Sequence, residues 1–162
     1  MPQKKLNLTD ECFKKNYESQ PDKTALIIAR SIDDYENYTY AMLYENILKI
    51  ASALEDYNLP KETPFVIRSI KNIDFVLLFF AAIKAGLNPI STLSGLTVKE
   101  VNFIINNSGA KLFYQSDKIA VQENEITKDV EIITESQLQK MKTHPIKTKF
   151  NEQYAYVDTP GI

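Results

Sequence analysis

The chain has 162 residues, which is enough for one domain with a buried hydrophobic core. Its 44% hydrophobic and 25% charged residues are typical of globular proteins and exclude disordered and fibrous classes. The formal net charge of -2 gives no electrostatic basis for binding nucleic acid or an acidic membrane surface.

The cysteine content and the length of the apolar runs indicate a compartment. A single cysteine, Cys12, excludes a disulfide within the chain and suits a reducing environment. No apolar segment follows the charged residues of the N-terminus, so a signal peptide is not predicted. The longest apolar run, residues 75–83, is about half of the ~20 residues that a membrane span needs. We therefore expect a soluble, cytoplasmic protein.

The first third of the chain predicts a short helix, a strand and a loop. Thr9 can cap the helix, Phe13 and Tyr17 share one of its faces, and Pro21 follows its end. Residues 24–29 are apolar after the first position, which predicts a buried strand. The polar and acidic residues 30–37 predict a turn or loop.

A long helix is expected to begin at Thr39 and to finish near residue 58, with Pro60 beyond it. Its apolar residues recur at helical spacing and form a single stripe. The stripe consists of Leu43, Ile47, Ile50, Ala51 and Leu54.

Residues 64–116 predict three strands that alternate with two helices. The strands are expected at residues 64–69, 88–92 and 110–115. Asn72 can cap the first helix, and Thr97 opens the second helix with a capping box that Glu100 completes. Connections this short in a strand–helix–strand order require parallel pairing. The predicted fold class is α/β, a three-layer, doubly wound, mainly parallel sheet flanked by helices.

The remaining residues predict smaller elements and an unusual ending. A polar loop (117–129), a strand (130–134) and a weak helical turn (136–142) come first. Residues 140–150 read as a linker before a last strand at 154–157, within a single domain over residues 1–162. Because that strand enters a Thr-Pro-Gly turn and nothing follows, we expect the chain to be the N-terminal part of a larger domain.

Several short motifs occur in a characteristic order. They are Thr24-Ala-Leu-Ile, Tyr38-Thr-Tyr-Ala, Asn72 with Asp74 and Phe75, Lys84-Ala-Gly with Pro89, Thr97 with Glu100, and Asn107-Ser-Gly-Ala-Lys. In this order they resemble the adenylate-forming (AMP-binding) superfamily of acyl-CoA synthetases, luciferases and peptide-synthetase adenylation domains. The peptide-synthetase branch usually has Tyr-Pro-x-x-Arg where residues 94–99 read Ser-Gly-Leu-Thr-Val-Lys, which favours the acyl-CoA synthetase branch.

The resemblance implies the N-terminal subdomain of an AMP-forming ligase. In such enzymes ATP and a carboxylic acid give an acyl-adenylate and pyrophosphate, and coenzyme A then takes the acyl group as a thioester. ATP, Mg²⁺ and coenzyme A are therefore implied for a longer parent protein. The 162 residues alone are expected to bind none of these and to be inactive, without catalytic or metal-binding residues of their own.

The resemblance also implies a phosphate-binding loop at the end of the chain. In the superfamily, a Gly/Ser/Thr-rich loop follows a strand of this type and cradles phosphates with its backbone amides. Thr159 and Gly161 match the start of that loop. Pro160 and Ile162 depart from it, because proline lacks an amide donor and isoleucine lacks a hydroxyl group.

Other polar and aromatic residues are interpreted as structural. His144 is expected to be a solvated linker residue, since no serine, cysteine or carboxylate is positioned to work with it. Cys12 lacks an activating base, so we expect it to be a structural residue and not a nucleophile. The lysines near the C-terminus predict a solvated connector, the acidic pairs in loops predict no metal site, and three phenylalanines predict core packing. The lysines are Lys140, Lys142, Lys147 and Lys149. The acidic pairs are Asp33 with Asp34 and Glu123 with Glu125, and the phenylalanines are Phe75, Phe79 and Phe80.

Two other interpretations stay open. A stand-alone α/β ligand-binding module would need a pocket at the carboxyl ends of the strands. A non-catalytic protein-interaction module is the second. In either case the helix expected at 73–85 is apolar all round and needs cover. We therefore expect an exposed apolar patch or an unpaired strand edge, and self-association of the chain.

Overall fold

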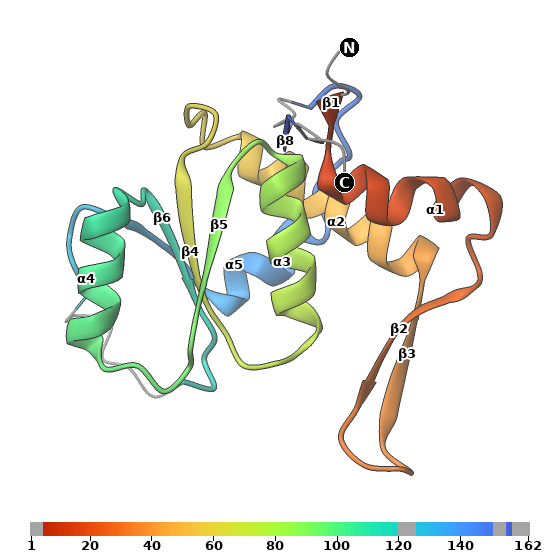
Figure 1. Ribbon diagram of the computed structural model, residues 1–162, viewed down its shortest axis with the longest axis horizontal. Helices are drawn as coiled ribbons and strands as arrows, with labels where there is room; N and C mark the ends of the chain where they lie inside the picture. Colours follow the sequence, from red (N-terminus) through yellow and green to blue (C-terminus); the bar gives the residue numbers. More distant parts are fainter. Residues whose placement is uncertain (1–4, 120–125, 151–154, 157–162) are drawn as a thin grey trace, which may run out of the picture.

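The structure is a computed structural model that describes residues 5–119, 126–150 and 155–156. Its centre is a parallel sheet in the order β5-β4-β6-β7. The strands are β4 (Pro64–Arg68), β5 (Asn88–Thr92), β6 (Leu112–Gln115) and β7 (Glu131–Ile133). Helices cover both faces of this sheet (Figure 1), which confirms the predicted α/β class.

The helices form two unequal layers. One face of the sheet packs against α4 (Val98–Ser108), and the other packs against α2 (Tyr40–Glu55), α3 (Ile73–Lys84) and α5 (Glu135–Met141). Side chains alternate along each strand, so Phe65 and Ile67 of β4 enter the larger core while Val66 enters the α4 core. This alternation explains why β4 is apolar throughout.

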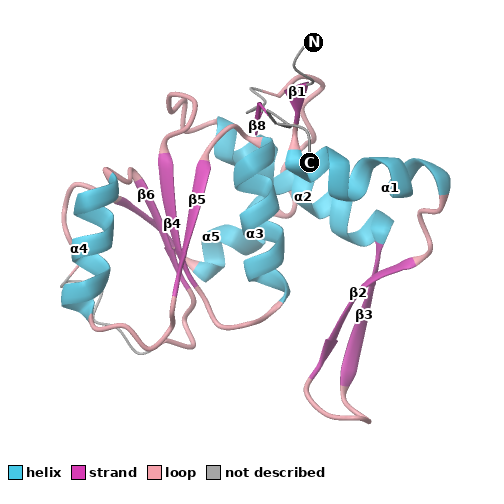
Figure 2. Cartoon of the chain, in the orientation of Figure 1, coloured by secondary structure: helices cyan, strands magenta, loops and turns pink. Residues whose placement is uncertain are grey.

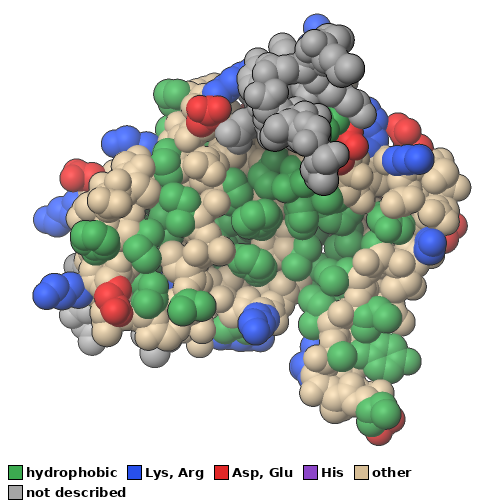
Figure 3. Space-filling model, in the orientation of Figure 1, with side chains coloured by type: hydrophobic (Ala, Val, Ile, Leu, Met, Phe, Trp, Pro, Cys, Tyr) green, Lys and Arg blue, Asp and Glu red, His purple; other side chains and the backbone are tan. Residues whose placement is uncertain are grey.

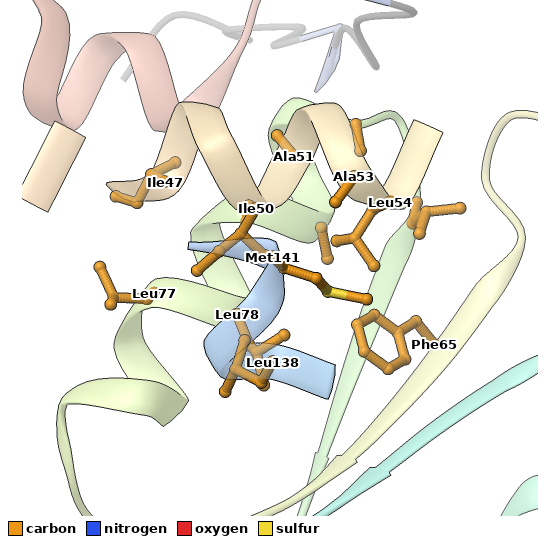
Figure 4. Packing of buried hydrophobic residues seen from close by; sticks show 14 of the residues in the cluster. Ile47, Ile50, Ala51, Ala53, Leu54, Phe65, Leu77, Leu78, Leu138 and Met141 are labelled. Carbon is orange, nitrogen blue, oxygen red and sulfur yellow. The ribbon is translucent and has the colours of Figure 1, made fainter. Parts of the chain in front are cut away.

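The larger core lies where three helices meet the sheet. In Figure 4, Ile50 and Leu54 of α2, Leu78 of α3 and Leu138 of α5 converge beside Phe65. The whole predicted stripe of α2 is buried. Helical periodicity therefore identified the core face of this helix correctly.

Side-chain caps set the beginnings of the central helices. Thr39, Asn72 and Thr97 accept hydrogen bonds from the backbone amides of the residues three positions later. The Glu100 carboxylate in turn accepts from the Thr97 amide at 2.8 Å, which completes the predicted capping box. Helix α4 ends at Gly109, whose φ of 70° lies in the left-handed region.

The strand predicted at residues 24–29 is present, but the prediction that it is buried was wrong. β2 (Thr24–Ala29) pairs antiparallel with β3 (Tyr35–Thr39), and this hairpin projects from the body of the molecule (Figure 2). Ile27 is 58% exposed. A uniformly apolar run resembles a buried parallel strand, but its partner, β3, overlaps the segment 30–37 that we expected to be a loop.

The expected Thr9 cap was also wrong. Asn7 accepts from the amides of Thr9 and Asp10 instead, ahead of η1 (Asp10–Lys14) and α1 (Lys15–Ser19). The Thr9 hydroxyl donates to the carbonyl of Phe80, at 2.7 Å. The N-terminal segment is thereby joined to α3.

Short strands lie at the two ends of the described chain. β1 (Lys5–Leu6) pairs antiparallel with β8 (Ala155–Tyr156), which falls inside the last strand that we expected. Across the described ranges, no helix combines the length and the apolar character that a membrane crossing requires.

Residues 142–150 lie against the carboxyl end of α2. Lys147 Nζ is 2.6 Å from Asp56 Oδ1, and His144 Nε2 is 2.8 Å from Asp56 Oδ2. The Lys147 amide donates to Ser52 Oγ at 2.9 Å. Hydrogen bonds from Lys147 and then His144 lower the pKa of Asp56 from its ordinary value.

We expect Gly109→Ala to lower the free energy of unfolding by about 1–2 kcal/mol, because alanine is strained at a positive φ. The space around the new Cβ is open at Gly109 and also at Gly95, where no positive φ is present. Gly95→Ala is thus the matched control and should leave stability nearly unchanged in urea unfolding. Equal effects of the two substitutions would refute the explanation.

The contacts of Asp56 should weaken in acid. Because the folded pKa is depressed, their contribution is present above the unfolded pKa, near 3.8, and is lost as pH falls through the folded value. Asp56→Asn should therefore show a shallower loss of stability between about pH 5 and pH 2. The effect is small, since Asp56 is exposed. Urea midpoints for both proteins measure it, and parallel curves would contradict it.

Candidate functional site

The carboxyl ends of β4, β5 and β6 form the candidate site. In open parallel sheets, ligands bind outside this edge, where loops leave neighbouring strands. The in-register pairs Arg68–Thr92 and Arg68–Gln115 place three polar residues in one row across the last positions of these strands. This row lies on the same face of the sheet as α4, because Val66 packs there and Arg68 is two residues further along.

Arg68 is buried without a carboxylate partner. It is 3% exposed, and none of the ion pairs within the described residues includes it. Its guanidinium donates to the carbonyls of Ser94 (2.9 Å) and Leu96, and to Gln115 Oε1 (3.3 Å). Burial lowers the pKa of Arg68 from its ordinary value. The side chain therefore fastens the β5–α4 loop to the sheet with neutral acceptors only.

A small cavity of about 270 Å³ opens beside this row. Thr92 belongs both to the row and to the cavity wall. The wall consists of Ser69, Ile70, Lys71, Phe75, Ser91, Thr92, Leu93 and Ser94. Within the described residues, Thr92 Oγ1 and Arg68 Nε are buried without a hydrogen-bond partner. Serine and threonine residues and one lysine share this wall with Ile70, Phe75 and Leu93, so polar and apolar side chains line the cavity together.

On the opposite face of the sheet, an ion pair joins two helices. Asp74 Oδ1 lies 2.6 Å from Lys142 Nζ, and Gln139 Nε2 approaches Asp74 Oδ2 at 3.5 Å. The buried hydroxyl of Tyr114 has no partner in the described chain. Burial, followed by the charge of Asp74, raises the pKa of Tyr114 from its ordinary value. The group stays protonated, so Tyr114 is not a base at neutral pH.

The residues interpreted as structural stay outside the candidate site. His144 and Lys147 bind Asp56, and Lys142 binds Asp74. Cys12 is exposed, and partial burial followed by the charge of Glu11 raises its pKa, which disfavours a reactive thiolate.

Of the three phenylalanines expected in the core, none is fully buried, and Phe75 lines the cavity. The acidic pair Asp33–Asp34 lies in the hairpin turn, where Asp34 binds Arg30. Glu123 and Glu125 lie outside the described residues. Over residues 5–119, 126–150 and 155–156, no group of three potential metal ligands occurs.

Both predicted phosphate-loop residues, Thr159 and Gly161, lie outside the described residues. Arg68 was not among the site residues predicted from the sequence. The only signal was a lone arginine at the end of the apolar run 64–67, at the position where a predicted parallel strand ends.

Arg68→Met should lower the free energy of unfolding by about 1–3 kcal/mol, because the carbonyls of Ser94 and Leu96 lose their donors. Arg30→Met is the matched control and should leave stability nearly unchanged, since Arg30 forms only exposed ion pairs with Asp34 and Glu36. Urea unfolding measures both. A loss at Arg68 no larger than that at Arg30 would contradict the fastening role.

Comparison with known proteins identifies the family. A model of the AMP-binding enzyme family matches residues 13–159. Acetyl-coenzyme A synthetase of Campylobacter jejuni is 26% identical over 112 residues, and the corresponding enzyme of Pasteurella multocida is 25% identical over 107 residues. These matches cover 69% and 66% of this chain but only 17% and 16% of the two relatives.

Solved structures share the fold at lower identity. A benzoate CoA ligase from Burkholderia xenovorans superposes with a TM-score of 0.78 at 18% identity, over 91% of this chain and 30% of that one. The NpsA N-terminal subdomain of Klebsiella oxytoca, in complex with anthranilyl-AMSN, gives 0.73 at 16% identity, over 93% and 36%. The O-succinylbenzoate coenzyme A synthetase of Bacillus subtilis, in complex with AMP, gives 0.71 at 15% identity, over 96% and 36%. This chain has the fold of the N-terminal subdomain of adenylate-forming enzymes, and it belongs to the AMP-binding enzyme family.

Proposed function

We propose that this chain serves as the N-terminal subdomain of an AMP-forming acyl-CoA synthetase-like ligase. In the proposed reaction, a carboxylate oxygen attacks the α-phosphate of ATP and pyrophosphate leaves. The thiol of coenzyme A then attacks the acyl carbonyl, and AMP leaves as the thioester forms. The family match over residues 13–159, together with the acetyl-coenzyme A synthetase relatives, carries this proposal.

The described residues supply a scaffold and only a small part of a ligand site. The 270 Å³ cavity is below the ~300–1,000 Å³ typical of ligand pockets. The described part of the chain contains no cluster that would hold Mg²⁺. We therefore propose that the 162 residues alone do not catalyse the reaction. A cytoplasmic location is part of the proposal, and the exposed free thiol of Cys12 supports it.

A stand-alone ligand-binding module is the second candidate. The cavity at the carboxyl edge, whose wall includes Lys71 and several serine and threonine residues, is the observation that favours it. Its size suits a small anion better than a nucleotide.

Titration of ATP·Mg²⁺ into the 162-residue chain, followed by calorimetry, separates the two candidates. We expect no binding heat and no exchange of pyrophosphate into ATP with acetate or benzoate. The complete product of the same gene should catalyse that exchange with at least one carboxylic acid. Micromolar binding of ATP, or of inorganic phosphate in a parallel titration, by the 162 residues would support the binding module. A complete product that is inactive with every acid would refute the ligase.

The proposed phosphate loop can be tested in that complete product. Gly161→Ala should lower kcat/KM for ATP about tenfold, because a Cβ group hinders the close approach of backbone amides to phosphate. Gly95→Ala is the control, since the space around its Cβ is open. Unchanged exchange in Gly161→Ala would remove Thr159 and Gly161 from the phosphate site.

A further inference from the structure

A second cavity lies at the amino edge of the main sheet, away from the candidate site at the carboxyl edge. Its volume is about 460 Å³, which is within the ~300–1,000 Å³ of typical ligand pockets. Lys84, the last residue of α3, belongs to its wall, and the chain then enters the amino end of β5 at Asn88 (Figure 1). The cavity is therefore separate from the smaller one that we described beside Thr92.

We call this space the lysine cavity, because four lysines belong to its wall and no aspartate or glutamate of the described residues does. They come from three parts of the chain: Lys14 from η1, Lys84 from α3, and Lys147 and Lys149 from the segment after α5. On the face drawn in Figure 3, hydrophobic side chains gather in the middle and most lysine and arginine side chains stand singly around the rim. Four lysines around one cavity are therefore a local concentration of positive charge.

Lys84 is a buried part of this wall and is held in place from several sides. It is 4% exposed, and its Nζ atom lies 2.9 Å from Asp10 Oδ2. The Tyr44 hydroxyl donates to Asp10 Oδ1 at 2.9 Å, and the ring centroid of Phe150 lies 5.0 Å from Lys84 Nζ. The back of the lysine cavity is thus formed by side chains with fixed partners, and a ligand would not have to order them.

The other three lysines differ in how their charges are neutralised. Lys147 Nζ lies 2.6 Å from Asp56 Oδ1. Lys14 and Lys149 are exposed, and neither takes part in the ion pairs found among the described residues. The charges of Lys14 and Lys149 therefore have no carboxylate partner at the cavity. A ligand with two negative charges would neutralise both.

The rest of the wall, apart from Thr148, is apolar or aromatic. Tyr44 and Leu48 of α2 lie there together with Ile146 and Phe150. Such side chains gain free energy by covering the carbon atoms of a ligand, whereas the lysines bind its charged group. The composition of the wall therefore suits an organic anion better than an inorganic ion.

We propose that the lysine cavity binds a small phosphate monoester with an apolar or aromatic body. At neutral pH such a group carries nearly two negative charges and three acceptor oxygens, which matches the exposed Lys14 and Lys149. The body of the ligand lies against Leu48, Ile146 and Phe150. The site is independent of the proposed ligase chemistry, because it lies at the opposite edge of the sheet and its test contains no ATP.

Titration of phenyl phosphate into the ¹⁵N-labelled 162-residue chain, followed by NMR, tests the proposal. The amide signals of Lys147 and Lys149 should shift and saturate with a Kd of about 0.1–1 mM. Inorganic phosphate lacks the ring and should bind at least about threefold more weakly. Absence of saturation with phenyl phosphate, or equal affinities for the two anions, would overturn the proposal.

Lysine substitutions locate the site. Lys14→Gln and Lys149→Gln each remove one exposed charge and should each weaken phenyl phosphate binding about fivefold. Lys15→Gln is the matched control, since Lys15 is as exposed as its neighbour but does not belong to the wall. Equal weakening in Lys15→Gln would reduce the effect to general charge and overturn the site. Loss of binding in Lys71→Gln alone would also overturn it, because Lys71 belongs to the carboxyl-edge cavity.

Discussion

Helix α3 needs apolar surroundings on nearly every side, and much of the structure follows from how its two charges are accommodated. Lys84 binds Asp10 and thereby fixes the N-terminal segment at one end of the helix. Asp74 binds Lys142 and fixes the end of α5 at the other. Removing one partner of a buried ion pair costs about 3–5 kcal/mol, whereas replacing both with apolar groups is often neutral. The two pairs therefore determine where distant segments sit more than they raise the total stability.

The part of the fold that local rules describe could be predicted from the sequence. Asn72 and Thr97 cap helices through amides three residues away, so each signal is contained in a short window. Thr9 is a threonine like Thr97, but its hydroxyl donates to the carbonyl of Phe80, 71 residues away. The exposure of β2 likewise depends on a partner strand that the sequence does not mark. The predictions that failed, the Thr9 cap and the burial of β2, depend on contacts between segments that are not resolved by local sequence rules.

The candidate site shows the same division. The alternation of strands and helices indicated that any ligand would lie at the carboxyl edge, and the cavity is there. The residues at that edge were not predicted. Arg68 has no carboxylate partner, and its charge is balanced by two loop carbonyls that become neighbours only after the β5–α4 connection folds back. No spacing rule links position 68 to positions 94 and 96, so a motif search passes over this residue.

The outward side of α3, which carries half-buried Val76, Phe79 and Ile83, connects the fold with the family. Relatives that share this fold are much longer, since the chain spans 17% of the acetyl-coenzyme A synthetase of Campylobacter jejuni. Leaving apolar surface such as this in water costs about 25 cal/mol of free energy for each Å². Covering this side of α3 therefore stabilises the fold, and segments of the longer relatives that have no counterpart in this chain are the groups that could supply the cover.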